Sequence, residues 1–214
     1  MRLFLILVLA LVSCTKFGKN VTVKGRVMNP VTGQGIEGAE VKLLRVKGGY
    51  DSNYKTIKSV VTDASGNFEL DKYTWASPVA RCETGDFYRL GWTKDGGQTF
   101  IDNFELEVKK GKVTNADFYA IPYGNLQINI NNTSCFDSND ELKIYRTHSI
   151  PGFYDDVPNP AIYLGCVNQT GNMNKAPMGW YKYSGTVTKN GIVTPKKDSI
   201  YLNEGETKVW NINY

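Results

Sequence analysis

The chain has 214 residues, enough for one large or two ordinary domains, and a formal net charge of +4 from 25 basic and 21 acidic side chains. The charges are scattered and form no block of five or six of one sign, so the sequence supports neither a nucleic-acid groove nor a polybasic membrane patch. Thirteen Tyr, nine Phe and four Trp, punctuated by 21 Gly and eight Pro, predict an all-β protein.

The first 14 residues have the pattern of an export signal. Arg2 provides a positive charge, and residues 3–12 form an apolar run that is too short to cross a bilayer but has the length of a signal-peptide core. The run closes on the letters LVSC, ending at Cys14, which resemble the bacterial lipobox. The resemblance implies a signal peptide over residues 1–13, a diacylglyceryl thioether on Cys14 and acylation of the amine freed by cleavage.

A lipidated Cys14 would hold the protein on a membrane, because two or more acyl chains suffice for stable anchoring. Thr15 stands where the common inner-membrane retention signal has Asp, which favours the outer membrane, with its periplasmic face and the cell surface both open. Residues 14–20 are predicted to be the lipidated cysteine and a short tether. The alternatives are an ordinary secretory signal that contains a cysteine and a disordered apolar end.

Residues 21–121 are predicted to form a first β-sandwich. Val21, Val23 and Val27 alternate with polar residues, and further short alternating segments follow as far as Ala120. VKGRVMNPVTGQGIEGAEVKLL followed by VVTDASGNFEL resembles the carboxypeptidase regulatory-like family. The resemblance implies a prealbumin-like sandwich, and such modules usually do no chemistry.

Two features of this segment are interpreted as structural. Gly38 and Gly66 fall where the chain must turn tightly. Asp63 to Asn67 is expected to be a hairpin-like connection and not a calcium loop, because it lacks the order of ligands that an EF-type loop needs.

Residues 122–214 are predicted to form a second β-sandwich, which we match to no family. AIPYG, residues 120–124, is the predicted seam, and Asn190-Gly191 predicts a two-residue hairpin. Trp210, Ile212 and Tyr214 share one face of the last expected strand, so the chain should end within a sheet.

Three cysteines follow Cys14. An exported chain meets an oxidising compartment, which favours a disulfide. We expect Cys135 to pair with Cys166, since both lie in the second half, and Cys82 to be a buried thiol. Pairings in which Cys82 replaces one of the two stay open, because a sequence does not decide connectivity.

Two long aromatic, Pro- and Asn-rich connections, residues 149–160 and 169–183, carry the candidate ligand-binding side chains. Aromatic faces stack on sugar rings, while carboxylates and amides bond hydroxyl groups. The alternative is that the aromatic side chains fold back and close the ends of the sandwich. The candidates are Phe153, Tyr154, Asp155, Trp180 and Tyr181, with Asp156 and Asn172 as further polar groups. Clustering of the four aromatic residues on one exposed surface favours sugar binding, and burial of all four would remove it.

The sequence offers little for catalysis. His148 is the one histidine, whereas a catalytic zinc site usually takes two or three, and we expect it on the surface. No G-x-S-x-G motif accompanies it. CFDSNDE, residues 135–141, offers oxygen ligands for calcium, but a solvated turn is preferred. We therefore expect no enzyme, no cofactor and no metal.

These inferences together predict a non-catalytic outer-membrane lipoprotein that acts as an accessory protein, scaffold or binding module, with a glycan or an envelope protein as partner. One alternative is a carbohydrate-binding lipoprotein of a polysaccharide-uptake system. Another is a subunit of a surface appendage or adhesin, in which strands add edge to edge. A removable or unpaired terminal strand would favour the appendage subunit, and a C-terminal strand held in mid-sheet would count against it.

Overall fold

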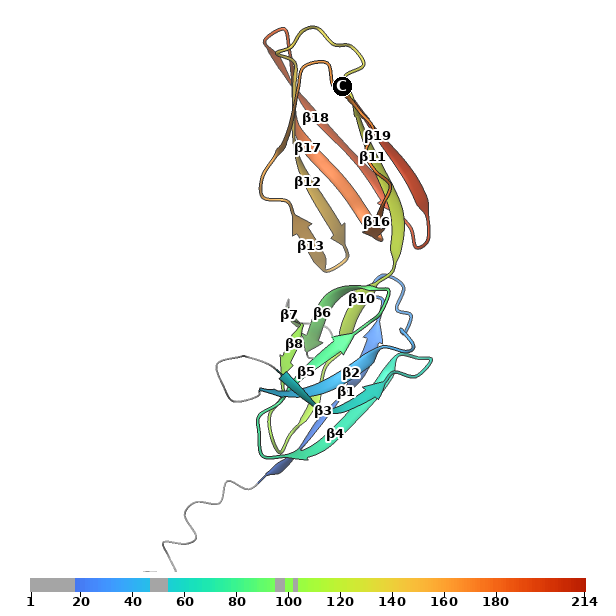
Figure 1. Ribbon diagram of the computed structural model, residues 1–214, viewed down its shortest axis with the longest axis vertical. Coiled ribbons are helices and arrows are strands. Elements are labelled where there is room, and N and C mark those ends of the chain that lie inside the picture. The colour runs from blue at the N-terminus through green and yellow to red at the C-terminus, as the bar shows by residue number, and fades with distance from the viewer. Residues whose placement is uncertain (1–17, 47–53, 95–98, 102–103) are drawn as a thin grey trace, which may run out of the picture. The chain divides into compact units, whose positions relative to one another are not determined.

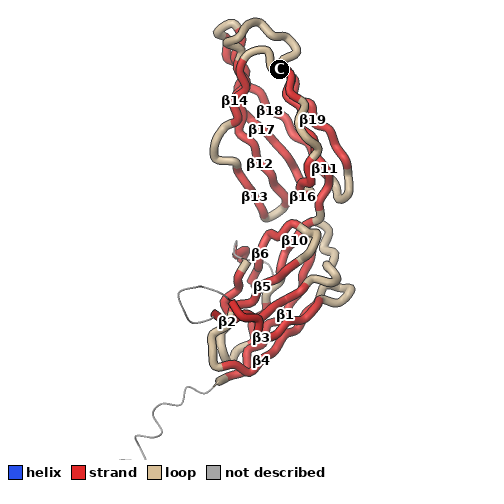
Figure 2. Tube along the Cα trace, in the orientation of Figure 1, coloured by secondary structure: helices blue, strands red, loops and turns tan. Residues whose placement is uncertain are grey.

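The structure, a computed structural model, describes residues 18–46, 54–94, 99–101 and 104–214. Over these ranges the chain consists of strands, turns and loops, as expected of an all-β protein (Figures 1 and 2). The expected signal peptide and Cys14 lie outside the described residues. Within the described ranges, no helical segment has the length and hydropathy needed to span a membrane.

Strands β1 to β10 form two sheets, ordered β4-β1-β10-β6-β7, with β9 also on β1, and β3-β2-β5-β8. The strand bounds are β1 Lys19–Met28, β2 Glu40–Val46, β3 Tyr54–Val61, β4 Asn67–Thr74, β5 Val79–Glu83, β6 Tyr88–Lys94, β7 Thr99–Ile101, β8 Glu105–Glu107, β9 Val113–Asn115 and β10 Phe118–Ile121.

Strands β11 to β19 form two further sheets, ordered β15-β11-β16, with β19 also on β11, and β13-β12-β17-β18, with β14 also on β12. The strand bounds are β11 Tyr123–Asn131, β12 Glu141–Ile150, β13 Phe153–Asp156, β14 Ala161–Leu164, β15 Asn168–Gln169, β16 Asn174–Pro177, β17 Gly179–Lys189, β18 Ile192–Leu202 and β19 Thr207–Asn213.

The chain divides into two compact units. The first contains the described parts of residues 18–28, 35–83 and 91–118, and the second contains residues 29–34, 84–90 and 119–214. Each unit has two sheets that face each other across buried apolar side chains, which is the two-sandwich fold that the alternation predicted.

The core of the first sandwich is built from the inward side of alternating strands. Val21, Val23 and Val27 of β1 are fully buried, as their spacing predicts. Trp92 and Phe118, also fully buried, meet edge to face with ring centroids 5.0 Å apart. Aromatic pairs of this geometry contribute beyond the area that they bury.

The expected hairpin around Asp63 is wrong in one respect, because β3 and β4 lie in different sheets. β3 pairs with β2, whereas β4 pairs with β1, so the connection crosses the sandwich. The Asp63 carboxylate holds this turn by accepting hydrogen bonds from the backbone N–H of Ser65 and of Asn67. Gly66 has φ +78°, and a Cβ there would lie 2.2 Å from the Val27 carbonyl oxygen, so glycine is required.

The second sandwich has β12, β17 and β18 as its long strands. Leu142 and Ile144 are fully buried and pack with Tyr183 and Trp210 in one core. Asn190 and Gly191 have φ values of 48° and 72° between β17 and β18, which confirms the two-residue hairpin.

The two expected connections contain strands. After a turn in which Gly152 has φ +78°, residues 153–156 form β13 and pair with the end of β12. Residues 174–177 form β16 on β11, and β17 already begins at Gly179. Pairing with long neighbouring strands therefore outweighs the Pro- and Asn-rich composition that predicted loops.

Candidate functional site

The outer face of the β13-β12-β17-β18 sheet carries a row of aromatic side chains. Tyr154 lies opposite Ser149, Ser149 opposite Trp180, and Trp180 opposite Tyr201. Residues directly opposite each other project from the same face. Tyr154 is 64% exposed and Trp180 is 42% exposed, and the Trp180 and Tyr201 rings lie 5.2 Å apart at 71°.

Polar side chains adjoin this row and line a groove of about 850 Å³ over the same face. Tyr145 and Tyr154 contribute aromatic surface, while Asp156 and Lys182 contribute opposite charges. The Lys182 ammonium lies 5.7 Å from the centroid of the Trp180 ring, within the range of a cation–π contact. The groove therefore combines flat apolar surface with hydrogen-bond donors and acceptors, the combination that a sugar chain requires.

The five candidate ligand-binding residues do not gather at one place. Tyr154 and Trp180 are on the outer face, whereas Phe153 and Tyr181 are half-buried on the inner face, where each ring contacts His148. Asp155 is exposed and lies opposite His148 in the strand register. Side chains alternate along a strand, so neighbours in sequence such as Trp180 and Tyr181 must separate.

Tyr181 has a structural role at the end of the sandwich. Its hydroxyl donates to the Pro177 carbonyl oxygen at 2.7 Å, and burial raises its pKa. His148, expected on the surface, is half-buried instead, with Nε2 3.0 Å from the Met178 carbonyl oxygen. The inner-face aromatics thus match the alternative in which they close an end of the sandwich.

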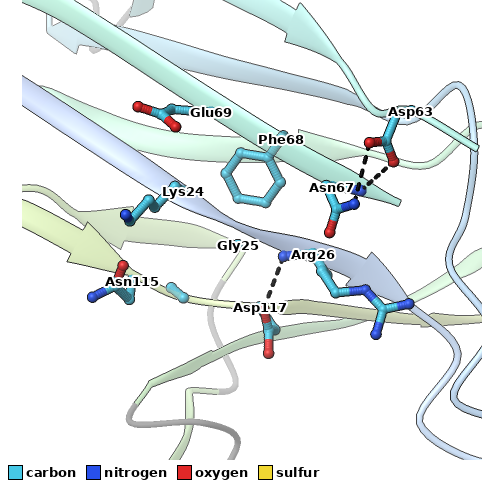
Figure 3. A pocket seen from close by; sticks show the side chains of 10 residues that line it. Lys24, Gly25, Arg26, Asp63, Asn67, Phe68, Glu69, Asn115 and Asp117 are labelled. Atoms are coloured by element: carbon cyan, nitrogen blue, oxygen red, sulfur yellow. Dashed lines mark hydrogen bonds between the residues drawn. The ribbon is translucent and has the colours of Figure 1, made fainter. Parts of the chain in front are cut away.

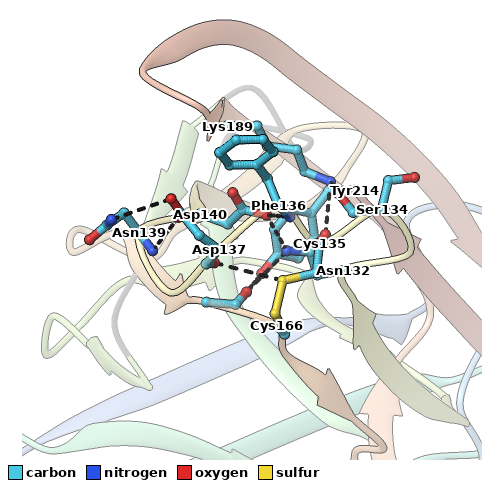
Figure 4. Close-up of a disulfide and its surroundings, with 11 residues drawn as sticks. Asn132, Ser134, Cys135, Phe136, Asp137, Asn139, Asp140, Cys166, Lys189 and Tyr214 are labelled. Carbon is cyan, nitrogen blue, oxygen red and sulfur yellow. Dashed lines mark hydrogen bonds between the residues drawn. A yellow bond between two sulfur atoms is a disulfide. The ribbon is translucent and has the colours of Figure 1, made fainter.

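The disulfide between Cys135 and Cys166 is present, with the two Cα atoms 5.2 Å apart, as predicted (Figure 4). Asp140, fully buried beside it, accepts hydrogen bonds from the Phe136 N–H and the Asn132 Nδ2, and the first of these lowers its pKa. This carboxylate organises the loop, a role that the sequence did not reveal.

The same loop is not arranged as a calcium site. The Lys189 ammonium donates to the Asn132 Oδ1 at 2.8 Å and to the Ser134 carbonyl oxygen at 2.7 Å. A cation bound there would be repelled by this ammonium group. Across the part of the chain that the structure describes, no three His, Cys, Asp or Glu side chains are grouped to hold a metal ion.

A second hollow, of about 570 Å³, lies over β1 and β4 in the first sandwich (Figure 3). Several of its polar groups bond to the protein itself. Asp117 accepts from the Arg26 N–H at 2.8 Å, and the Asn67 side chain donates to Asp63. The backbone N–H of Asn67 is the main cause of the lowered pKa of Asp63. These bonds hold β1 and the turn at Asp63, and the groove lined by Tyr145 and Tyr154 is the better candidate for ligand binding.

Strand β19 lies at the edge of its sheet, where β11 is its only strand partner within the described residues. Amide side chains cross from β11 to β19: Asn129 donates to Asn211 at 2.8 Å, and Asn131 donates to Asn213 at 3.2 Å. Tyr214 directs both its N–H and its carbonyl toward β11. By the alternation of a parallel pair, the backbone groups of residues 209, 211 and 213 point to the open edge.

The other sheet edges in the described ranges are short or carry charges or proline. β18, the edge of the neighbouring sheet, contains Pro195, Lys196 and Lys197, which discourage pairing with another strand. The outward row of β19 is neutral: Thr207, Val209, Asn211 and Asn213. β19 is therefore the long edge that is open to a further strand.

No protein-family model and no curated protein matches this chain. Among solved structures, it is similar to the TIE protein of Bacillus anthracis (13% identity, TM-score 0.34, 92% of this chain and 34% of that one). It is also similar to a DUF3823 family protein from Bacteroides uniformis (11%, 0.35, 86% and 99%) and to the shaft pilin SpaA of Lactobacillus rhamnosus GG (10%, 0.30, 92% and 96%). The chain thus spans about a third of the length of the TIE protein, and likenesses at these TM-scores assign neither a family nor a role.

Proposed function

We propose that this chain is a non-catalytic lipoprotein of the bacterial outer membrane whose second sandwich binds carbohydrate. The binding surface is the outer face of the β13-β12-β17-β18 sheet. The first sandwich of the chain resembles the carboxypeptidase regulatory-like family. We assign it the role of a spacer between the anchor at Cys14 and the binding surface.

The aromatic groove is the observation that carries this proposal. Tyr154 lines the groove with Lys182 and Asp156, and the exposed Trp180 adjoins it through its contact with Lys182. Because strand pairing fixes the backbone from which these side chains project, the backbone would need little ordering on binding.

Two features support an exported, anchored protein. The Cys135–Cys166 disulfide is stable in an oxidising compartment and is unusual in a reducing one. The segment that ends at Cys14 resembles a lipobox. Mass spectrometry of the native protein should find acyl chains on a Cys14 N-terminus, and a bare sulfur there would overturn the anchor.

A glycan array probed with residues 15–214 tests the carbohydrate proposal. We expect saturable binding that weakens about tenfold in Trp180→Ala, because one stacking contact is lost. Trp75→Ala, which removes an exposed tryptophan from the first sandwich, is the matched control and should bind as the unchanged chain does. Silence across the array would reject carbohydrate binding and leave the scaffold.

A subunit of a surface appendage is the second candidate, favoured by the open edge of β19. Strands add readily to such an edge, because unpaired N–H and C=O groups form a template for pairing. Asn211 at the centre of a two-fold antiparallel pair would face its own copy, and two amides can bond each other.

Cross-linking in intact cells tests this second candidate. In a hydrogen-bonded antiparallel pair, opposite Cα atoms lie about 5.5 Å apart, which suits a disulfide. Asn211→Cys should therefore give a dimer on a non-reducing gel, whereas Val193→Cys, on the protected edge strand β18, should not. Equal cross-linking of the two variants, or none of either, would exclude this pairing.

A further inference from the structure

Exposed aromatic and basic side chains meet at the end of the first sandwich where β1 begins. Tyr73 is 53% exposed and Trp75 is 63% exposed, and their rings meet edge to face at 6.2 Å. The loop of residues 109–112, which follows β8, lies against them, since the Lys110 ammonium donates to the Trp75 carbonyl oxygen at 2.9 Å. Two segments about 35 residues apart thus share one surface.

The backbone fixes this arrangement. Asn20 of β1 lies opposite Tyr73 of β4, and the Gly111 N–H donates to the Asn20 carbonyl oxygen at 2.7 Å. The Thr22 N–H reaches the Lys112 carbonyl oxygen at 3.4 Å. The basic-aromatic patch is defined by Lys19, Tyr73, Trp75, Lys109, Lys110 and Lys112.

The acidic residue closest in sequence to Tyr73 on β4 is paired with a lysine outside the patch. Asp71, two residues before Tyr73 on β4, is paired with Lys58 at 3.2 Å. Lys19, Lys109 and Lys112 are exposed. Backbone pairing therefore brings the start of β1 and the loop of residues 109–112, with their lysines, to the same end of the sandwich as Tyr73 and Trp75.

The patch adjoins the expected anchor. Gly18 lies against the Tyr73 ring, since a Cβ on Gly18 would be 2.6 Å from a ring carbon. Cys14 is four residues earlier, and four residues span at most about 14 Å. Acyl chains on Cys14 would therefore bring the bilayer to the patch.

We propose that the basic-aromatic patch docks on a phospholipid surface with anionic headgroups. Tryptophan and tyrosine favour the interface between headgroups and acyl chains, and lysines near that interface are attracted by anionic lipids. A lipid anchor alone does not fix the orientation of a protein relative to the membrane. A second contact through the basic-aromatic patch would restrict the orientation of the first sandwich. The location of the contact rests on the anchor in the proposed function.

Vesicle co-sedimentation of residues 15–214, which lack the lipid, tests the patch by itself. We expect binding to phosphatidylethanolamine vesicles that contain phosphatidylglycerol, weaker binding without phosphatidylglycerol, and loss at raised salt. Lys109→Glu with Lys112→Glu should reduce the partition coefficient at least about tenfold, because two attractions become repulsions. Tyr73→Ser with Trp75→Ser should reduce it as well.

The matched control is Tyr154→Ser with Trp180→Ser, the same chemical change on the aromatic face of the second sandwich. This variant should bind vesicles as the unchanged chain does. Absence of vesicle binding by the unchanged chain, or an equal loss in the control, would overturn the proposal. Because the tested chain carries no acyl group, its result is independent of the mass spectrometry that tests Cys14.

Discussion

The two sandwiches expose the same kinds of aromatic residue in different electrostatic surroundings. Tyr73 and Trp75 in the first lie among lysines, at one end of the sandwich. Tyr154 and Trp180 in the second lie on a sheet face with both Lys182 and Asp156. A surface of one charge suits a charged plane such as a bilayer, whereas mixed donors and acceptors suit the hydroxyl groups of a sugar. The neighbouring side chains, more than the aromatic rings themselves, distinguish the two proposed roles.

The largest expected change is in the free energy of unfolding. It should distinguish a buried aromatic residue of the core from an exposed aromatic residue of the proposed binding surface. Trp92 is fully buried, so Trp92→Ala should lower the free energy of unfolding by about 3–5 kcal/mol. Trp180→Ala should change it by about 0.5 kcal/mol or less. Denaturant titration with each variant measures both values, and similar losses would contradict the presented role of Trp180.

Removal of the disulfide should lower the free energy of unfolding of the second sandwich and leave that of the first unchanged. The 31-residue separation predicts a loss of about 3–4 kcal/mol for Cys135→Ser with Cys166→Ser on the chain-entropy model. Limited proteolysis during denaturant titration follows the two units separately. An equal shift of the first unit would show that the two sandwiches unfold as one.

Alanine substitutions at two glycines, one in each sandwich, should lower the free energy of unfolding by smaller amounts. Gly191→Ala places a side chain at φ +72° in open space and should cost about 1 kcal/mol. Gly66→Ala adds a clash with the Val27 carbonyl oxygen at a similar φ and should cost at least about 1 kcal/mol more. Thermal unfolding compares the two, and equal costs would show that the β3–β4 crossing relaxes.

The smallest effect concerns pH. The Asn203 N–H, followed by Lys208, lowers the pKa of Glu206 to about 2. A lowered pKa in the folded state means that the carboxylate stabilises the fold above its usual pKa and that this contribution is lost as the pH falls toward 2. The melting temperature of Glu206→Gln should therefore lie below that of the unchanged chain at pH 7, and the gap should shrink below about pH 4.5. A difference in melting temperature that did not change with pH would contradict a stabilising role of the ionised Glu206 carboxylate.

Local patterns in the sequence predict much of the fold. The alternation of Val21, Val23 and Val27 and the Asn190-Gly191 turn are each specified within a few residues. The Cys135–Cys166 pair is the preferred one of several pairings that the sequence leaves open. The sheet to which a strand belongs is specified by distant partners. For that reason the local pattern predicts that β3 and β4 pair with each other and that β13 is a loop, whereas distant partners place β3 and β4 in different sheets and make β13 a strand.

The candidate sites depend still more on distant pairing. The composition of residues 149–160 and 169–183 identifies Trp180 and Tyr154 as candidates. The strand register, however, places Phe153 and Tyr181 on the opposite face of the sheet. Residues 72–75, KYTW, and residues 108–113, VKKGKV, are each unremarkable alone. The basic-aromatic patch forms because β1 pairs with β4 and because the loop of residues 109–112 bonds to β1.

Burial of the Cys82 thiol in β5 has a consequence for the order in which the protein folds and its disulfide forms. The first sandwich is synthesised ahead of the second, and once it has folded this thiol is out of reach. When Cys135 and Cys166 arrive they then meet only each other, so correct oxidation follows from timing. If the first sandwich folded slowly, the Cys82 thiol could form a disulfide with Cys135 or Cys166, and the native pair would then have to form by thiol–disulfide exchange.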